Sequence, residues 1–169
     1  AAFFDATVTS VSNPKGILVP HAGYIYSGSC AAVSYSRISP DFDGTFVVIG
    51  TSHKGHPNSV SNLDWETPIG TVPSDTEFAD AVPLPKNNDI FREQENSLET
   101  QMPFIAYRFP KAKVCAILMG DQSLKGAAEI SDAVISAVSK TNRRIIVAAS
   151  GDGSHYVPAK KAENDDLTC

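Results

Sequence analysis

Three of the four histidines, His21, His53 and His155, each follow a short apolar run that predicts a β-strand. Glycine and serine stand near each of them, and these small residues let the backbone approach a ligand closely. In open α/β sheets, ligands bind beyond the carboxyl ends of the strands. Imidazole ligates iron, copper and zinc, and it titrates near neutral pH. We therefore expect one polar pocket that can hold a metal ion, transfer protons or do both. The alternative for each histidine is a hydrogen-bonded or solvated loop residue.

Two aspartates and a tyrosine are candidates to complete this pocket. Asp121 and Asp152 also follow strand-like runs, so they can either orient the imidazoles or cap the helices that come next. Tyr24 is close enough in sequence to His21 to line the same cleft, as are its neighbours Tyr26 and Ser27. A tyrosine also packs well at a half-buried strand end, and the sequence leaves both roles open.

Glu99 and Gln101 lie in a predicted helix, from which a carboxylate or an amide can reach the pocket. A solvated helix face is the equally good alternative for both. His56 stands beside glycine and proline, and we interpret it as a surface residue.

Strand-like and helical segments alternate along the chain and must position these residues. Four runs predict strands that end in polar loops: Lys15–Val19, Thr45–Ile49, Val114–Met119 and Ile145–Ala149. Helices are predicted over four segments: Gly28–Ile38, Ser74–Val82, Ser97–Arg108 and Ser123–Lys140. Pro103 is expected to limit or kink the third helix. Asn87–Glu95 is expected to be a loop, and Pro158–Cys169 a surface helix or a frayed end. This order predicts one α/β domain over residues 1–169, with parallel crossovers.

The composition excludes several classes of protein. A chain of 169 residues that is 42% apolar suits one domain with a sizeable core. A net charge of −5 without a basic stripe argues against nucleic acid as a partner. The longest apolar runs are far shorter than the roughly 20 residues of a membrane helix, so no membrane span is expected. The N-terminus lacks the pattern of a signal peptide, which makes a cytoplasmic protein the default.

The three cysteines, Cys30, Cys115 and Cys169, are an odd number at wide spacings. That pattern fits neither a disulfide framework nor a structural zinc cluster. Cys115 lies in an apolar run and is expected to be an ordinary core residue.

The string Pro20–Gly28, with the sequence PHAGYIYSG, resembles the signature of the Memo-like family. Further matches fall in the expected order: Gly50–His53, Asn96–Phe104, Gly120–Ser123 and Asp152–Tyr156. Together they span most of the chain, from about Lys15 to Asp165. The resemblance implies a cytoplasmic protein with a three-layer α/β/α sandwich around a mostly parallel sheet. This fold is similar to that of class III extradiol ring-cleavage dioxygenases, whose non-haem iron lies at the matching strand ends.

The resemblance also implies separate roles for the pocket residues. His21 and His53 match the two family histidines that ligate metal, and His155 matches one that would act as acid/base in the dioxygenase relatives. Many family members have histidine where this chain has Asn96, which does not titrate. The family supplies a further cysteine ligand far downstream. Either Cys169 is its equivalent after a large deletion, or the C-terminal region of the family is absent from this sequence.

These residues favour a metal-binding protein that uses non-haem iron or copper, with zinc as a further candidate, and that is redox-active toward dioxygen. Aromatic ring cleavage needs a carboxylate ligand, for which Glu99 is the candidate, and is the less favoured version. The alternative is a non-catalytic binding module whose cleft holds a peptide or a small anionic ligand. The expected partner is a small molecule or a peptide in either case.

Overall fold

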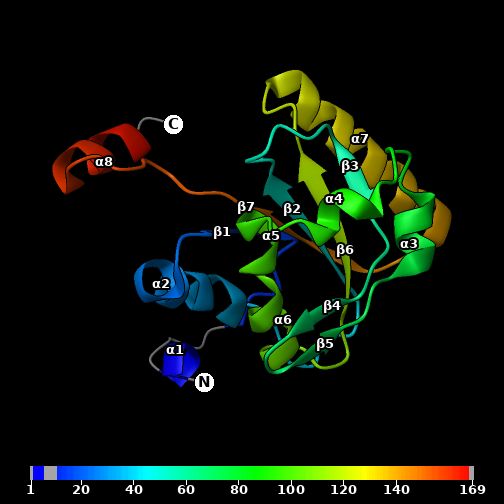
Figure 1. Ribbon diagram of the computed structural model, residues 1–169. Helices are drawn as coiled ribbons and strands as arrows, with labels where there is room; N and C mark the ends of the chain where they lie inside the picture. The colour runs from blue at the N-terminus through cyan, green and yellow to red at the C-terminus, as the bar shows by residue number, and fades with distance from the viewer. Residues whose placement is uncertain (1, 6–10, 168–169) are drawn as a thin grey trace.

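A five-stranded sheet forms the centre of the molecule, whose computed structural model describes residues 2–5 and 11–167 (Figure 1). The strands are, in spatial order, β1 (Gly16–Val19), β7 (Ile145–Ser150), β2 (Thr45–Thr51), β6 (Lys113–Met119) and β3 (Ser59–Ser61). The first four run parallel, and β3 runs antiparallel to β6. The four strands predicted from the sequence are confirmed, as is the mostly parallel sheet.

Helices cover both faces of the sheet, as a parallel sheet requires. One face carries α2 (Tyr24–Ser36), α4 (Asn88–Arg92), α5 (Asn96–Glu99) and α6 (Met102–Arg108). The other face carries α3 (Thr76–Ala81) and α7 (Leu124–Thr141). Side chains alternate between these faces along β2, so that Phe46 and Val48 enter one apolar cluster and Val47 enters the other. The three-layer arrangement expected from the sequence is confirmed.

Both ends of helix α7 lie close to the predicted positions. The Ser123 hydroxyl accepts a hydrogen bond from the backbone N–H of Gly126 at 3.2 Å and caps the first turn. Asn142 takes a left-handed conformation, with φ of 51°, directly after the last turn. Ile130 and Ala137 on the inner face are buried against the sheet. The helix predicted over Ser123–Lys140 is therefore confirmed.

The helix predicted over Gly28–Ile38 starts four residues earlier, at Tyr24. The backbone N–H of Ser27 donates to the carbonyl oxygen of Gly23 at 3.1 Å, which closes a first turn. Glycine, serine and tyrosine have weak helix propensity, so the sequence here is typical of a loop, but the tertiary structure overrides that preference. As a result, α2 begins only three residues after His21.

Two other segments differ from the prediction. The loop expected over Asn87–Glu95 contains α4, a five-residue helix too short to show a helical period. Its first turn is fixed by the Asn87 side chain, which accepts from the backbone N–H of Asp89 at 3.2 Å. The helix expected over Ser97–Arg108 is divided into α5 and α6, and Pro103, which was expected to limit or kink it, stands in the first turn of α6.

The remaining elements are short or lie at the ends of the described chain. The strands β4 (Trp65–Thr67) and β5 (Gly70–Val72) form a hairpin next to α6, and like β3 they are too short to be predicted from alternation. Helix α1 (Ala2–Asp5) lies beside α2, and α8 (Ala159–Asp166) is the surface helix that was one of two expectations. No helix among the described residues is long and apolar enough to cross a membrane.

The cysteines provide a test of the core. Cys115 lies fully buried in β6, and burial, together with the charge of Asp75, raises the pKa of its thiol to about 12. Cys30 on α2 is exposed. Because the thiolate is the reactive form, we expect a water-soluble thiol reagent to modify Cys30 in the native protein and to spare Cys115. Cys30→Ser should remove a fast-reacting thiol, whereas Cys115→Ser should leave the native reaction unchanged. Equal protection of both thiols would contradict this packing.

Candidate functional site

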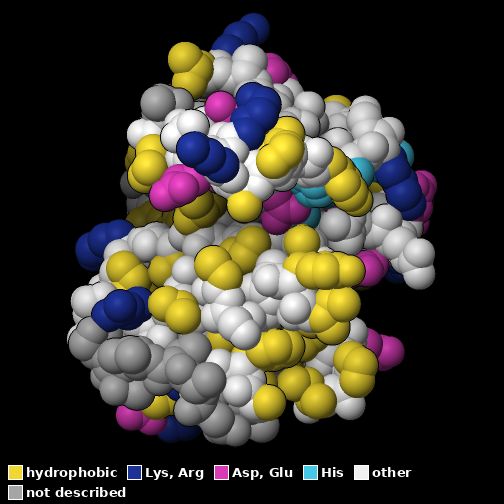
Figure 2. Space-filling model, turned by 90° about the vertical axis from the view of Figure 1, so that its left-hand side faces the viewer, with side chains coloured by type: hydrophobic (Ala, Val, Ile, Leu, Met, Phe, Trp, Pro, Cys, Tyr) yellow, Lys and Arg dark blue, Asp and Glu magenta, His cyan; other side chains and the backbone are white. Residues whose placement is uncertain are grey.

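The histidines meet because the strands that precede them are neighbours. Strand β7 lies between β1 and β2, and all three run parallel. Their carboxyl ends therefore lie at one edge of the sheet, with Ser150 paired to Val19 on one side. The loops that follow bring His21, His53 and His155 to one cleft of about 830 Å³. Figure 2 shows histidine side chains at a hollow in the surface, with hydrophobic side chains nearby.

His21 is the most enclosed of the three, with 5% of its surface exposed. Its backbone N–H donates to Asp152 Oδ1 at 2.9 Å, and its ring Nδ1 lies 3.2 Å from Ser150 Oγ. The other ring nitrogen, Nε2, is 3.6 Å from Asp152 Oδ2. Burial lowers the pKa of His21, and the nearby charge of Asp152 opposes this only in part. This favours the neutral form of the ring, which is the form that binds metal.

The buried side-chain amide of Gln101 supports the ring of His21 through Ser150. Gln101 has no exposed surface, and its Nε2 donates to Ser150 Oγ at 3.0 Å and to the carbonyl oxygen of Pro20 at 2.9 Å. Its Oε1 accepts from the hydroxyl of Tyr35 at 3.2 Å. A continuous chain of hydrogen bonds thus links Tyr35 in the core to the ring of His21.

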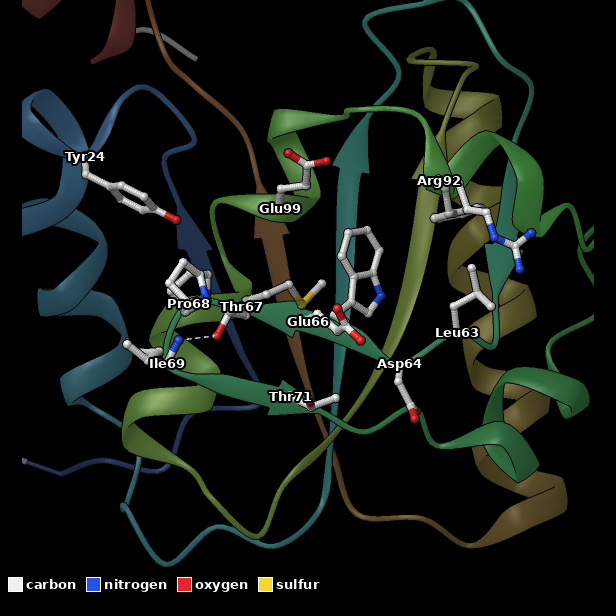
Figure 3. Close-up of a pocket in the computed structure, with 14 residues that line it drawn as sticks. Tyr24, Leu63, Asp64, Glu66, Thr67, Pro68, Ile69, Thr71, Arg92 and Glu99 are labelled. Carbon is white, nitrogen blue, oxygen red and sulfur yellow. Dashed lines mark hydrogen bonds between the residues drawn. The ribbon is translucent and has the colours of Figure 1, made fainter.

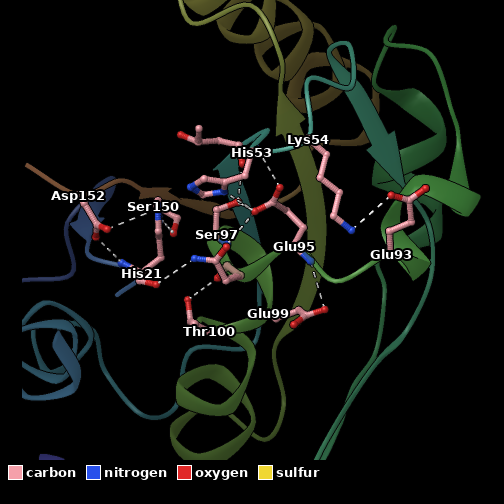
Figure 4. Close-up of polar contacts among 12 residues, drawn as sticks. His21, His53, Lys54, Glu93, Glu95, Ser97, Glu99, Thr100, Ser150 and Asp152 are labelled. Carbon is pink, nitrogen blue, oxygen red and sulfur yellow. Dashed lines mark hydrogen bonds and ion pairs between the residues drawn. The ribbon is translucent and has the colours of Figure 1, made fainter. Parts of the chain in front are cut away.

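His53 is held by a buried carboxylate (Figure 4). Glu95 accepts from the backbone N–H of His53 at 2.9 Å and lies 2.7 Å from its ring Nδ1. Ser97 adds two further donors to Glu95, its backbone N–H at 3.1 Å and its hydroxyl at 3.0 Å. Burial raises the pKa of Glu95, but these hydrogen bonds outweigh it and hold the pKa below its usual value. Because a carboxylate only accepts, Nδ1 of His53 carries a proton, and in the neutral imidazole Nε2 then keeps a free lone pair.

Asp152 connects the two sides of the cleft. Its Oδ2 lies 3.6 Å from His21 Nε2 and also 3.6 Å from His155 Nδ1. The His155 side chain is 55% exposed, and its ring lies against that of Tyr156, with the centroids 4.7 Å apart. Asp152 therefore places its carboxylate between a buried and an exposed imidazole.

The other residues singled out in the sequence lie in different places. Asn96 lines the histidine cleft and donates to the carbonyl oxygen of His21 at 3.4 Å. Tyr24 and Glu99 line a neighbouring cleft instead. Asp121 does not line this cleft, and it accepts from the backbone N–H of Ser123, the residue that caps α7.

His56 is only partly buried, and its Nε2 lies 3.2 Å from Glu93. Cys169 lies outside the described residues, so the structure does not place it.

The donor set is partly suited to a metal ion. The rings of His21 and His53 lie edge to face with their centroids 5.2 Å apart, and a carboxylate holds the outer nitrogen of His53, as is usual for metal-binding histidines. Within residues 2–5 and 11–167, no group of three or more His, Cys, Asp or Glu side chains is placed to hold a metal ion. The described chain therefore places two imidazoles side by side in this cleft, with a carboxylate next to each of them.

Three supporting residues were missed by the sequence analysis or left without a role. Glu95 directly precedes the Asn96–Phe104 motif, and Ser150 is the last residue of a predicted strand. A position next to a predicted motif or at the end of a predicted strand is the signal that could have identified both residues as supporting groups. Gln101 was considered only as a residue that could reach the pocket.

The buried His21 ring predicts an acid-sensitive fold in the metal-free protein. Its folded pKa lies below the unfolded value of 6.5, so the unfolded chain binds the proton first as the pH falls. Above the unfolded pKa, the neutral ring of His21 therefore makes its full contribution to the stability of the fold. This contribution is lost as the pH falls toward the folded pKa. We expect the thermal midpoint of the wild type to fall more than that of His21→Gln between about pH 7.5 and pH 5.5. Parallel pH profiles would contradict this.

Comparison with known proteins adds family information to this geometry. A family model described as "Memo-like protein" matches residues 1–169. Among curated proteins, a "MEMO1 family protein" of Archaeoglobus fulgidus is 38% identical over 151 residues, which cover 87% of this chain and 57% of that protein. One from Methanosarcina acetivorans is 38% identical over 156 residues, with 89% and 58% covered. One from Methanothermobacter thermautotrophicus is 37% identical, with 94% and 60% covered. This chain therefore spans less than two thirds of the length of these relatives.

Proposed function

This chain belongs to the Memo-like family, and we propose that it binds a transition-metal ion through His21 and His53 in a redox-active site. The observation that carries this proposal is the buried carboxylate of Glu95, 2.7 Å from Nδ1 of His53. It fixes the tautomer that leaves Nε2 free to bind a metal. His21 adds a second neutral imidazole within the same cleft.

Iron and copper are the ions that best suit this pair of imidazoles and a redox role, and zinc is a further candidate. When bound, such an ion would supply a centre at which dioxygen or another small oxidant can react. The third ligand would be Cys169, or a residue of a further region that corresponds to the part of the relatives outside the matched length. We propose a cytoplasmic location for the protein, as the family resemblance implies.

Asp152 and His155 have a separate task in this proposal. Their carboxylate and imidazole would hold and move a proton beside His21 once Asp152 Oδ2, which lies 3.6 Å from a ring nitrogen of each histidine, comes within hydrogen-bond distance. His155 reaches solvent and can exchange the proton there, as a general acid or base requires.

Metal titration tests the ligand assignment. Protein purified without added metal is analysed for metal content and then titrated with iron and with copper, in the wild type, His21→Ala and His53→Ala. We expect each substitution to weaken binding by more than about 100-fold, beyond the loss of an outer-shell partner. His56→Ala is the matched control and should bind as the wild type does. Binding that is substoichiometric and unchanged in all four proteins would exclude a metal site at these residues.

A binding module that does not catalyse a reaction is the second candidate. It is favoured by two exposed aromatic side chains on the lining of the cleft, Tyr26 at 82% and Tyr156 at 100% exposure. Such rings are suited to contact a peptide or small anionic ligand.

Oxygen consumption or superoxide formation by the metal-loaded protein separates the candidates. We expect this activity to be lost in His155→Ala while metal binding is kept. Full activity in His155→Ala would remove this residue from proton transfer.

A further inference from the structure

A second cleft, of about 1040 Å³, is lined by Tyr24, Glu99 and Arg92 among other residues (Figure 3). It is bounded by the β4–β5 hairpin, by the ends of α4 and α6, and by Tyr24. Helix α5 separates the two clefts, because Asn96 lines the histidine cleft whereas Glu99 lines this one. The second cleft contains neither His21 nor His53, so it is a site distinct from the proposed metal site.

Aromatic side chains form a fixed part of its wall. Trp65, the only tryptophan of the chain, is partly exposed and packs against the core below the cleft. The hydroxyl of Tyr24 donates to the carbonyl oxygen of Thr100 at 3.2 Å, and its ring lies edge to face with Phe104 at 5.9 Å. Both rings are thus held in place while part of each surface stays open to solvent.

Carboxylates give this aromatic cleft a negative charge. Asp64, Glu66 and Glu99 line it, and within the described residues neither Glu66 nor Glu99 has an ion-pair partner. Among these residues, the partner of Glu99 is the backbone N–H of Glu95, from which it accepts a hydrogen bond at 3.3 Å. Burial raises the pKa of Tyr24, and the charge of Glu99 adds to this, so the carboxylate acts directly on the phenol.

One cation also lines the cleft, but its charge is already compensated. Arg92 Nη1 lies 2.8 Å from Asp89 Oδ1 on the same helix. Figure 3 places Arg92 at the opposite end of the cleft from Tyr24, with Glu99 between them. The region around the aromatic rings therefore has an excess of negative charge.

We propose that this cleft binds an organic cation, an alkylammonium or guanidinium group, on the aromatic faces of Trp65 and Tyr24 with Glu66 and Glu99 as counter-charges. The electron-rich face of an aromatic ring attracts cations, and tryptophan does so most strongly. The same features disfavour an anion, which three carboxylates would repel. The cation can come from a basic side chain of a peptide or from a free polyamine, since both present the same group.

The single tryptophan makes this proposal directly testable. Its fluorescence, excited beyond the tyrosine absorption band, is recorded while the full chain is titrated with choline and, separately, with the uncharged carbon isostere of choline. We expect choline to change the fluorescence in a saturable way, with an affinity that falls as salt is added. The isostere should cause no saturable change. Spermidine and a short lysine- and arginine-containing peptide are then compared, and the tighter of the two identifies the source of the cation.

Charge-removing variants separate a site from a general surface effect. The double variant Glu66→Gln with Glu99→Gln should raise the half-saturating choline concentration about tenfold. Glu163→Gln, which removes an exposed carboxylate from α8, should leave it unchanged. Circular dichroism confirms that each variant is folded. Equal responses to choline and its isostere, or equal affinity in the wild type and the double variant, would overturn the proposal. Both outcomes are independent of metal binding.

Discussion

Replacing Glu95 with glutamine is expected to weaken binding of iron or copper by about 10- to 100-fold, although Glu95 itself is not a proposed ligand. The carboxylate accepts hydrogen bonds from both the backbone and the ring of His53, and from Ser97. An amide presents one acceptor oxygen and a donor group to these donors, so one contact becomes repulsive. His53 then loses both its fixed orientation and the proton position that leaves Nε2 free. Isothermal titration of the metal-free protein measures the change.

A neighbouring carboxylate provides the control for this experiment. Glu93→Gln removes the same charge two residues away, where the side chain is exposed and pairs with Lys54 and His56. We expect its metal affinity to stay within about twofold of the wild type, as for most surface substitutions. NMR of the His53 ring in Glu95→Gln distinguishes a changed tautomer from an unfolded loop. Equal affinities in both variants would show that Glu95 does not orient a metal ligand.

The importance of Glu95 was not evident from the sequence, although the histidines were. His21 and His53 could be found because each follows an apolar run, and parallel strands end at a common edge. The role of Glu95 depends on how α5 lies across the end of β2. A side chain at Gly50 would come within 2.5 Å of Ser97 Oγ, so the glycine allows this close approach. Such a contact between distant segments leaves no periodic pattern in the sequence.

The order of the strands was likewise beyond the sequence. The predicted runs fixed four strands and their parallel direction, but they did not determine that β7 lies between β1 and β2. That order places Asp152 beside His21, 131 residues away along the chain. The elements that sequence reasoning missed, such as β3 and α4, have three to five residues, which is too short for either hydrophobic pattern to repeat clearly.

Gln101→Leu is expected to lower the free energy of unfolding by about 3 kcal/mol, because leucine matches the size of glutamine but makes none of its hydrogen bonds. The substitution leaves the buried hydroxyl of Tyr35 without its acceptor and removes the donor to the carbonyl oxygen of Pro20. Ser150 Oγ, which lies against the ring of His21, loses its donor as well. Urea denaturation followed by circular dichroism measures the loss. Gln122→Leu, at an exposed position, should change stability by less than about 0.5 kcal/mol.

A double-mutant cycle with Tyr35 tests whether the loss arises from this hydrogen-bonded chain. Tyr35 is fully buried, and its hydroxyl donates to Gln101 Oε1. In the Gln101→Leu background, Tyr35→Phe removes a hydroxyl that has lost its acceptor, so it should cost about 1 kcal/mol less than the same change in the wild type. Strict additivity of the two substitutions would mean that the hydroxyl and the amide do not depend on each other. The cost of Gln101→Leu would then come from its other contacts, at Pro20 and Ser150, which lie closer to His21.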